Sequence, residues 1–434
     1  MKKIIALIMA LALVMGLAIT ASAASITIMP NVPTGGSSTG ETYTAYKIFD
    51  ATYDGALGEN TPISYTIEET NPFFNAISAS GYFTLTEING DSGIHNVKKN
   101  DNFDDAAAAT LATQLKAVVD AKKLDGTESS NDVINVAGKG YYLITSTLGS
   151  KMIVDTLGDI TIETKNAYPS LTKEADKNTA AFGETVTYTV TVYVPATAVG
   201  EIKVIDTMTN LTYVALAEGT TADVTDSLNE KVVTFTIPAN VVAGNLDGTV
   251  TIKYTATVDA NQTTAKNEAY LTYSKFISTK VSTSLKNYVI DVFKYTGSEN
   301  TKTGLAGAGF VLKNSEGKYY KLTNGIVSWV DTEAEATEYK TADNAYTVTF
   351  AGLANGEYTL VEKTVPAGYN KANDTPVKVE NADRTDEYQI QVLNNTGSEL
   401  PSTGGIGTTL FYVIGGLLMT GAAVLLITKK RMPN

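Results

Sequence analysis

The stretch ETVTYTVTVYV (residues 184–194) alternates polar and apolar side chains along its whole length. Residues two apart in a strand share one face, and β-branched and aromatic residues suit a half-buried pleated surface. Similar stretches follow as VVTFTIPA (232–239), GTVTIKYTATV (248–258) and NEAYLTYS (267–274). Strands at this spacing are typical of a sandwich. We therefore predict a β-sandwich over residues 168–286.

The regions on either side also contain strands. Region 24–167 includes ETYTAYKIFDATY (41–53) and one Ala-rich segment (104–124) with Leu111, Leu115, Val118 and Val119 at helical spacing. Region 287–399 begins with NYVIDVFKY (287–295) and closes with DEYQIQVLNN (386–395). We expect a mainly β protein of tandem immunoglobulin-like sandwiches arranged as a rod, in which the first β domain carries a helical insertion.

The composition excludes several classes of site. The 434 residues include no cysteine and one histidine, and the net charge is −13. Disulfides are impossible, and structural zinc or a Ser-His-Asp site is disfavoured. The net negative charge and the lack of a visible basic patch in the sequence argue against nucleic-acid binding. We expect no cofactor, no metal and no enzyme activity, and we expect His95 to lie in a solvated loop.

The N-terminus reads as a secretory signal. Met1-Lys2-Lys3 precedes an apolar run that ends in Ala21-Ser22-Ala23. A basic start, a short apolar core and small residues at the end are the marks of a cleaved signal peptide. We predict that residues 1–23 are removed after Ala23; a retained membrane anchor is the alternative.

The C-terminus, residues 400–434, has three parts. Leu400-Pro401-Ser402-Thr403-Gly404 comes first, and the uncharged apolar segment 406–428 is long enough to span a bilayer. Lys429, Lys430 and Arg431 then favour a cytoplasmic end. This arrangement closely resembles the LPxTG sorting signal of sortase substrates, although an ordinary membrane-anchoring helix is the alternative. The resemblance implies that a sortase thiol attacks Thr403, releases the chain from Gly404 onward and joins Thr403 to an amine.

Alternation places a polar trio among apolar neighbours in two regions. In the third region Lys294 shares a face with Ile290 and Val292, Glu362 with Tyr358 and Leu360, and Asn394 with Ile390 and Val392. The second region repeats the pattern with Lys173, Asp206 and Asn267. Burying isolated ions costs several kcal/mol each.

Two interpretations of the trios remain open. One is a buried ion pair with a hydrogen-bonded Asn, or exposed residues at strand ends. The other is a spontaneous Lys–Asn isopeptide bond: an apolar site favours the neutral amine and the protonated acid, the amine attacks the amide, and ammonia leaves.

Three motifs in the third region resemble collagen-adhesin B-type (pilin) domains. They are EYTLVEKTVPAGY (357–369), GLAGAGFVL (304–312) and VLNNTGSELPSTGG (392–405). The resemblance implies a Lys294–Asn394 bond promoted by Glu362. Lys363 departs from the usual Thr, and Asn395, the rival to Asn394, falls on the other face.

The second region resembles the fimbrial isopeptide-forming middle domain. The matching segments are SLTKEAD (170–176), VIDTMTNLTY (204–213) and KNEAYLTYS (266–274). The resemblance implies a Lys173–Asn267 bond promoted by Asp206. The first region resembles the family most weakly; it has no convincing trio, and we predict no bond there.

A shaft subunit also needs an acceptor lysine, for which the family motif is W-x-x-x-V-x-V-Y-P-K-N. LGDITIETKNAYP (157–169) aligns Lys165 with that lysine, but Glu163-Thr164 replace Tyr-Pro and no Trp precedes. Alternation puts Lys165 on the face opposite Ile160 and Ile162. We expect it to be exposed, as an acceptor must be; a solvated lysine at a domain junction is the alternative.

The resemblance as a whole is to backbone pilins of Gram-positive sortase-assembled pili. It implies a secreted, wall-anchored fimbrial shaft subunit that joins Thr403 to Lys165 of the next copy and supports adhesion. The implied partners are pilus-type and housekeeping sortases, other copies of the chain, accessory pilins and peptidoglycan, with the membrane only in the precursor. The alternative is a wall-anchored adhesin or minor pilin that binds a host or matrix ligand.

Overall fold

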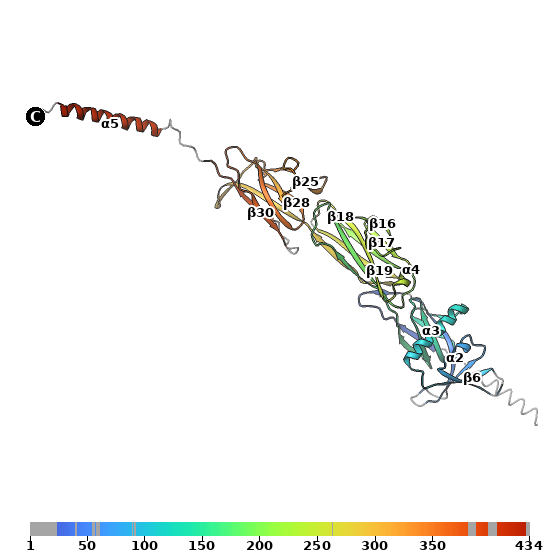
Figure 1. The fold of residues 1–434 in the computed structure, drawn as a ribbon. Coiled ribbons are helices and arrows are strands. Elements are labelled where there is room, and N and C mark those ends of the chain that lie inside the picture. Colours follow the sequence, from blue (N-terminus) through green and yellow to red (C-terminus); the bar gives the residue numbers. More distant parts are fainter. Residues whose placement is uncertain are drawn as a thin grey trace, which may run out of the picture. The chain divides into compact units, whose positions relative to one another are not determined.

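A computed structural model describes residues 24–39, 41–53, 57, 61–88, 90, 93–262, 264–380, 388–397 and 406–430 (Figure 1). The protein is mainly β, as predicted. It divides into two compact units, one ending at Asn287 and the other beginning at Tyr288, with the short segments Asn324–Val327 and Gly352–Ala354 grouped with the first. The domain boundaries predicted above and the rod arrangement stay predictions. The predicted regions 24–167, 168–286 and 287–399 are called the first, second and third domain below.

The first domain is built from two sheets. One has the order β11-β1-β8 and the other the order β10-β9-β3-β4-β6-β5, with β7 paired to β3. Their bounds are β1 (Ala24–Met29), β3 (Tyr43–Tyr53), β4 (Ile63–Glu68), β5 (Phe83–Glu87), β6 (Ile94–Lys99), β7 (Thr127–Glu128), β8 (Val133–Val136), β9 (Gly140–Ser146), β10 (Lys151–Thr156) and β11 (Ile160–Glu163).

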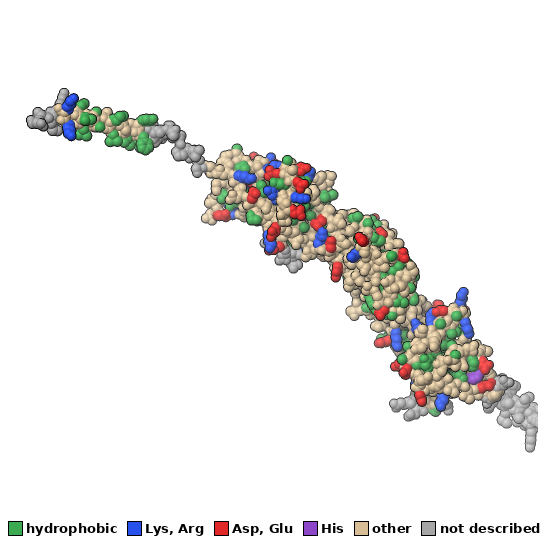
Figure 2. Space-filling model, in the orientation of Figure 1, with side chains coloured by type: hydrophobic (Ala, Val, Ile, Leu, Met, Phe, Trp, Pro, Cys, Tyr) green, Lys and Arg blue, Asp and Glu red, His purple; other side chains and the backbone are tan. Residues whose placement is uncertain are grey.

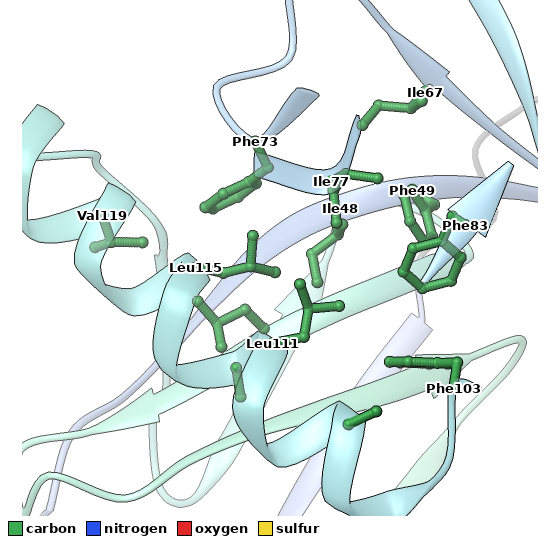
Figure 3. Close-up of a cluster of buried hydrophobic side chains, with 13 residues drawn as sticks. Ile48, Phe49, Ile67, Phe73, Ile77, Phe83, Phe103, Leu111, Leu115 and Val119 are labelled. Atoms are coloured by element: carbon green, nitrogen blue, oxygen red, sulfur yellow. The ribbon is translucent and has the colours of Figure 1, made fainter. Parts of the chain in front are cut away.

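The predicted helix is α3 (Asp105–Lys122). Asp104 caps it, because its side chain accepts a hydrogen bond from Ala107 N at 2.9 Å. Leu111, Leu115 and Val119 point into an apolar cluster (Figure 3). The sequence did not predict α2 (Phe74–Ser80), whose Ile77 contributes to the same cluster.

His95 does not lie in a solvated loop, so that expectation is wrong. It belongs to β6, its side chain is 14% exposed, and Nε2 lies 3.6 Å from Glu69 Oε1. Its ring also packs on Phe74 at a centroid distance of 5.1 Å. The pairing of β4 with β6 sets His95 opposite Ile67, close to Glu69 at the end of β4, and local polarity did not reveal this.

The second domain is a two-layer sandwich. One sheet has the order β12-β13-β18-β15, and the other the order β16-β17-β14-β19-β20-β2, in which β2 is Ser37–Ser38, with β21 paired to β19. The bounds are β12 (Ser170–Ala175), β13 (Thr185–Val194), β14 (Ile202–Thr209), β15 (Leu211–Leu216), β16 (Thr225–Asn229), β17 (Val232–Ile237), α4 (Ala239–Gly244), β18 (Gly248–Val258), β19 (Thr264–Tyr273), β20 (Phe276–Ile277) and β21 (Val281–Lys286). In β13 every second side chain is buried, as the alternation predicts.

A segment of the first region joins the sheet of the second domain. Strand β2 (Ser37–Ser38) pairs antiparallel with β20. Nearby, the buried Glu41 accepts hydrogen bonds from Lys275 N at 2.8 Å and Ser274 Oγ at 3.2 Å. Sequence alone assigned residues 24–167 to one domain. The pairing of β2 with β20 was not predicted, because the two strands lie far apart in the chain.

The third domain also has two sheets. One has the order β23-β22-β28, with β31 parallel to β22, and the other the order β26-β25-β24-β29-β30, with β27 paired to β24. The bounds are β22 (Tyr288–Ser298), β23 (Thr301–Gly304), β24 (Gly309–Asn314), β25 (Tyr319–Thr323), β26 (Ile326–Val330), β27 (Tyr339–Lys340), β28 (Thr347–Leu353), β29 (Gly356–Thr364), β30 (Thr375–Val379) and β31 (Tyr388–Leu393).

The C-terminal helix is α5 (Ile406–Lys430). Its residues Leu410–Lys430 are long and apolar enough to cross a membrane, with a mean hydropathy of 2.3. Figure 2 shows hydrophobic side chains along this helix and basic ones at its end. Residues 1–23, Leu400–Gly404 and Arg431 lie outside the described residues, so the signal peptide and the sorting pentapeptide stay sequence predictions.

Candidate cross-link sites and cell-wall anchor

The third-domain trio forms one buried cluster. Lys294 extends from β22, Glu362 from β29, and Asn394 follows directly after β31. The parallel register of β22 and β31 aligns Lys294 with Val392, and Asn394 N donates to Tyr295 O at 3.0 Å. This pairing carries Asn394 to the side of Lys294, and both side chains are fully or almost fully buried.

Glu362 touches both nitrogen atoms of the third-domain cluster. Its Oε1 lies 3.2 Å from Lys294 Nζ and accepts from Asn394 Nδ2 at 2.8 Å. Lys294 Nζ also donates to Asn394 Oδ1. Burial lowers the pKa of Lys294, which favours the neutral amine that a nucleophile needs. One carboxyl oxygen is therefore placed to take a proton from the amine and to return one to the amide nitrogen.

The second-domain trio bridges the two layers of the sandwich. Lys173 comes from β12 in one sheet, whereas Asp206 on β14 and Asn267 on β19 come from the other. The β14–β19 register pairs Asp206 with Ala269 and Met208 with Asn267, so the two polar residues are diagonal neighbours. A Lys173–Asn267 bond would therefore join the sheets.

The second-domain charges are fully removed from water. Lys173 Nζ contacts Asp206 Oδ2, and both side chains are fully buried. Burial lowers the pKa of Lys173 to about 8 and raises the pKa of Asp206, although each charge opposes the shift of the other. Both shifts favour the neutral pair over the ion pair.

A residue that the sequence did not indicate completes this cluster. Tyr254 on β18 is fully buried, and its hydroxyl contacts Lys173 Nζ at 2.6 Å, Asp206 Oδ2 at 2.6 Å and Asn267 Nδ2 at 3.0 Å. Its position in an alternating strand predicted only an inward aromatic ring. The hydroxyl's partners come from three other strands, so no local pattern identified them.

The first domain contributes an exposed lysine. Lys165 follows β11 and is exposed, as predicted, between the buried Thr164 and Asn166. Thr164 N donates to Met29 O at 3.0 Å, and Asn166 Nδ2 donates to Tyr43 Oη at 3.1 Å. Ser146 Oγ also donates to Asn166 Oδ1 at 2.7 Å. Among the described residues of region 24–167, the buried polar side chains include no lysine.

Comparisons with known proteins identify two segments of the chain. A family model described as a prealbumin-like fold domain (SpaA) matches residues 293–396. A second model, the LPXTG cell wall anchor motif of Gram-positive proteins, matches residues 393–432. No curated protein sequence matches the chain.

Several solved structures resemble the chain. The group B streptococcus pilus 2b backbone protein is 26% identical over 53% of this chain and 99% of its own, with a TM-score of 0.42. The T6 backbone pilin of serotype M6 Streptococcus pyogenes is 16% identical over 82% and 79%, with a TM-score of 0.44. The full-length major pilin SpaD from Corynebacterium diphtheriae is 15% identical over 86% and 97%, with a TM-score of 0.47.

The two family matches agree with the predicted resemblance of the C-terminal part of the chain to a pilin domain followed by a sorting signal. The first covers both Lys294 and Asn394, and the second begins at residue 393 and covers Leu400–Gly404 together with α5. The chain therefore carries a prealbumin-like SpaA domain directly before an LPXTG cell wall anchor motif, and it is anchored to the cell wall at the surface.

Proposed function

We propose that the protein is the shaft subunit of a covalently polymerised surface pilus. The observation that carries this proposal is the order of chemical groups along the chain. An exposed lysine, Lys165, comes first; two buried clusters, each with a lysine, an acid and an asparagine, follow; the wall anchor comes last. A subunit that bears tension between its two ends needs a linkage point at each end and reinforced domains between them.

The internal reinforcement would be two amide bonds. Lys294 would attack Asn394 Cγ with Glu362 relaying protons, and Lys173 would attack Asn267 Cγ beside Asp206. Each reaction forms one C–N bond, breaks another and releases one ammonia. A neutral amide then replaces the buried lysine and the acid is left protonated, so no ion remains buried and the desolvation cost disappears.

The intermolecular bond would join Thr403 of one copy to Lys165 of the next. Its support is the presentation of Lys165: the backbone on both sides is tied down by Thr164 and Asn166, while the lysine itself is exposed. A sortase would carry the Thr403 acyl group to the Nζ atom. A polymer built in this way makes the protein structural rather than an enzyme.

The test is an SDS gel of wall extracts from cells that express the protein with its sortase. Wild type should give a ladder of SDS-resistant bands, and Lys165→Ala should give only the single anchored species. Lys98→Ala, which removes another exposed lysine of the first domain, is the matched control and should keep the ladder. A single species from wild type would contradict the shaft proposal and favour an adhesin.

A further inference from the structure

The two buried clusters differ in how the acid reaches the asparagine. In the third domain one oxygen, Glu362 Oε1, contacts both Lys294 Nζ and Asn394 Nδ2. In the second domain Asp206 Oδ2 contacts Lys173 Nζ, and the hydroxyl of Tyr254 stands between Asp206 Oδ2 and Asn267 Nδ2. The amide nitrogen that must leave is therefore joined to the acid through a tyrosine.

The position of Tyr254 is rigidly held. Its ring stacks on Tyr188 at a centroid distance of 5.4 Å and packs on Phe235 at 4.8 Å. Strand β18 pairs with β13 on one side and β15 on the other, which places this residue inside its sheet. The side chain has no exposed surface, so bulk water cannot replace its hydroxyl.

We propose that Tyr254 is a catalytic residue for the Lys173–Asn267 bond and that its hydroxyl passes a proton from Asp206 to the departing Asn267 nitrogen. This inference rests on the proposed isopeptide bond of the second domain. A hydroxyl has one donor hydrogen and two acceptor lone pairs, so it can receive a proton on one side while it gives its own on the other.

The proton transfers balance in this scheme. Lys173 first gives a proton to Asp206, which leaves a neutral amine and a neutral acid. The amine attacks Asn267 Cγ, giving a tetrahedral centre with a negative Oδ1 and a positive Nζ. The Nδ2 lone pair is no longer delocalised, so Nδ2 takes the Tyr254 hydroxyl proton while Asp206 reprotonates the tyrosine.

The last steps restore the acid. The Cγ–Nδ2 bond breaks as the carbonyl reforms, and ammonia leaves with the bonding pair. Asp206, now a carboxylate, takes the remaining excess proton from Nζ. The products are an amide, ammonia, a neutral Asp206 and an intact Tyr254. Burial and the charge of Asp206 raise the Tyr254 pKa well above 10, so the hydroxyl carries its proton at neutral pH.

The test follows bond formation in the mature chain (residues 24–403). The chain is isolated unfolded and is then refolded, and its intact mass and Lys173–Asn267 cross-linked peptide are recorded over time. Tyr254→Phe should form the third-domain bond normally but the second-domain bond about 100-fold more slowly, the usual size of a lost general acid. Tyr213→Phe is the matched control: its ring packs on Tyr254 at 6.0 Å, but its hydroxyl bonds to Asp226, so it should behave as wild type.

Each other outcome has a defined meaning. If Tyr254→Phe forms the second-domain bond at the wild-type rate, the role of Tyr254 is overturned and the proposed bond stands. If wild type never forms that bond, the proposed cross-link of this domain fails, and this inference fails with it.

A purely structural role of Tyr254 is tested in a variant that cannot form the bond. In Asn267→Ala, adding Tyr254→Phe removes the hydrogen bonds of the hydroxyl to Lys173 and Asp206, so it should lower the unfolding midpoint but leave the second domain folded. A second domain that does not fold without the hydroxyl would mean that Tyr254 only holds the fold, and it would overturn the proposal.

Discussion

Buried lysines are the most informative residues in this chain. Lys173 and Lys294 are placed inside apolar cores, where a charged ammonium would be strongly destabilising. Period-2 alternation alone identified both, because a charge on the inward face contradicts the pattern around it. Their acid and amide partners were found in the same way. The structure brings the third-domain trio into direct contact and joins Asn267 to Lys173 and Asp206 through Tyr254.

Glu362→Gln tests the chemistry of the third domain. Wild-type mature chain should lack the mass of two ammonias, and the variant should lack only one, because Gln cannot relay protons. The lost cross-link spans 100 residues, and its loss should lower the free energy of unfolding by about 4–5 kcal/mol on the chain-entropy model used for disulfides.

The control for this variant is Glu357→Gln. Glu357 lies on the same strand but is exposed, so the substitution should leave both ammonia losses intact. Intact-mass spectrometry and denaturant unfolding are the measurements. Loss of both ammonias in Glu362→Gln would contradict the role of this acid.

The pKa of Lys173 leads to a pH-dependent stability when its bond cannot form. In Asn267→Ala, Lys173 stays an amine whose folded pKa is about 8, against an ordinary lysine pKa of 10.5 in the unfolded chain. Between these values the unfolded chain binds more protons than the folded one, so stability rises with pH. The slope is at most about 1.4 kcal/mol per pH unit.

Wild type should lack this dependence, because the cross-linked Lys173 is an amide that no longer titrates. Denaturant unfolding of both proteins at pH 8, 9 and 10 measures the difference. Their free energies of unfolding should approach each other as pH rises. A constant difference across this range would show that Lys173 does not titrate as an isolated amine.

At the scale of the elements, the segment that follows β11 presents the side chain of Lys165 to solvent. Thr164 and Asn166 turn inward and are hydrogen-bonded, and Lys165 between them turns outward. Alternation predicted the outward direction. The two anchors were not predicted, because their partners Met29, Tyr43 and Ser146 belong to other strands.

Asn166→Ala should loosen this segment without removing the lysine. The substitution leaves the buried hydroxyl group of Tyr43 and the half-buried hydroxyl group of Ser146 with fewer partners, a cost of about 1–3 kcal/mol. Limited trypsin digestion should therefore cut after Lys165 faster than in wild type. Asn96→Ala, at an exposed strand position, should not change that rate, and equal rates for all three proteins would contradict the anchoring role.

At the scale of the whole molecule, the important feature is the position of the sorting signal at the C-terminal end. The described chain of the third domain reaches residue 397, and α5 begins at Ile406, so the sorting pentapeptide lies in the short stretch between a folded domain and an apolar helix. Residue 396 still pairs with Tyr369, which ties the chain to the domain close to the sorting signal. A load on Thr403 would therefore reach Asn394 within a few residues.

Removal of α5 tests the anchor. A chain that ends at residue 405 keeps the pentapeptide but lacks the apolar helix that we expect to hold it at the membrane for processing. The protein should move from the wall fraction to the culture medium, as measured by immunoblots of both fractions. Full-length protein is the control, and continued wall attachment of the truncated chain would contradict the role of α5.

Sequence alone predicted the main strands, the inward direction of each member of the two trios and the long helix, because each follows from alternation or helical spacing within one short stretch. The signal peptide and the sorting signal are likewise predicted from contiguous residues. The sorting signal and the side-chain alternation can be seen without a fold. Only the tertiary structure decided that β2 joins the second domain, that His95 packs against Phe74 and Glu69, and that Tyr254 joins Asp206 to Asn267. The physical reason is that these contacts cross between strands, and the partner of a strand is chosen by packing of the whole domain rather than by its own residues.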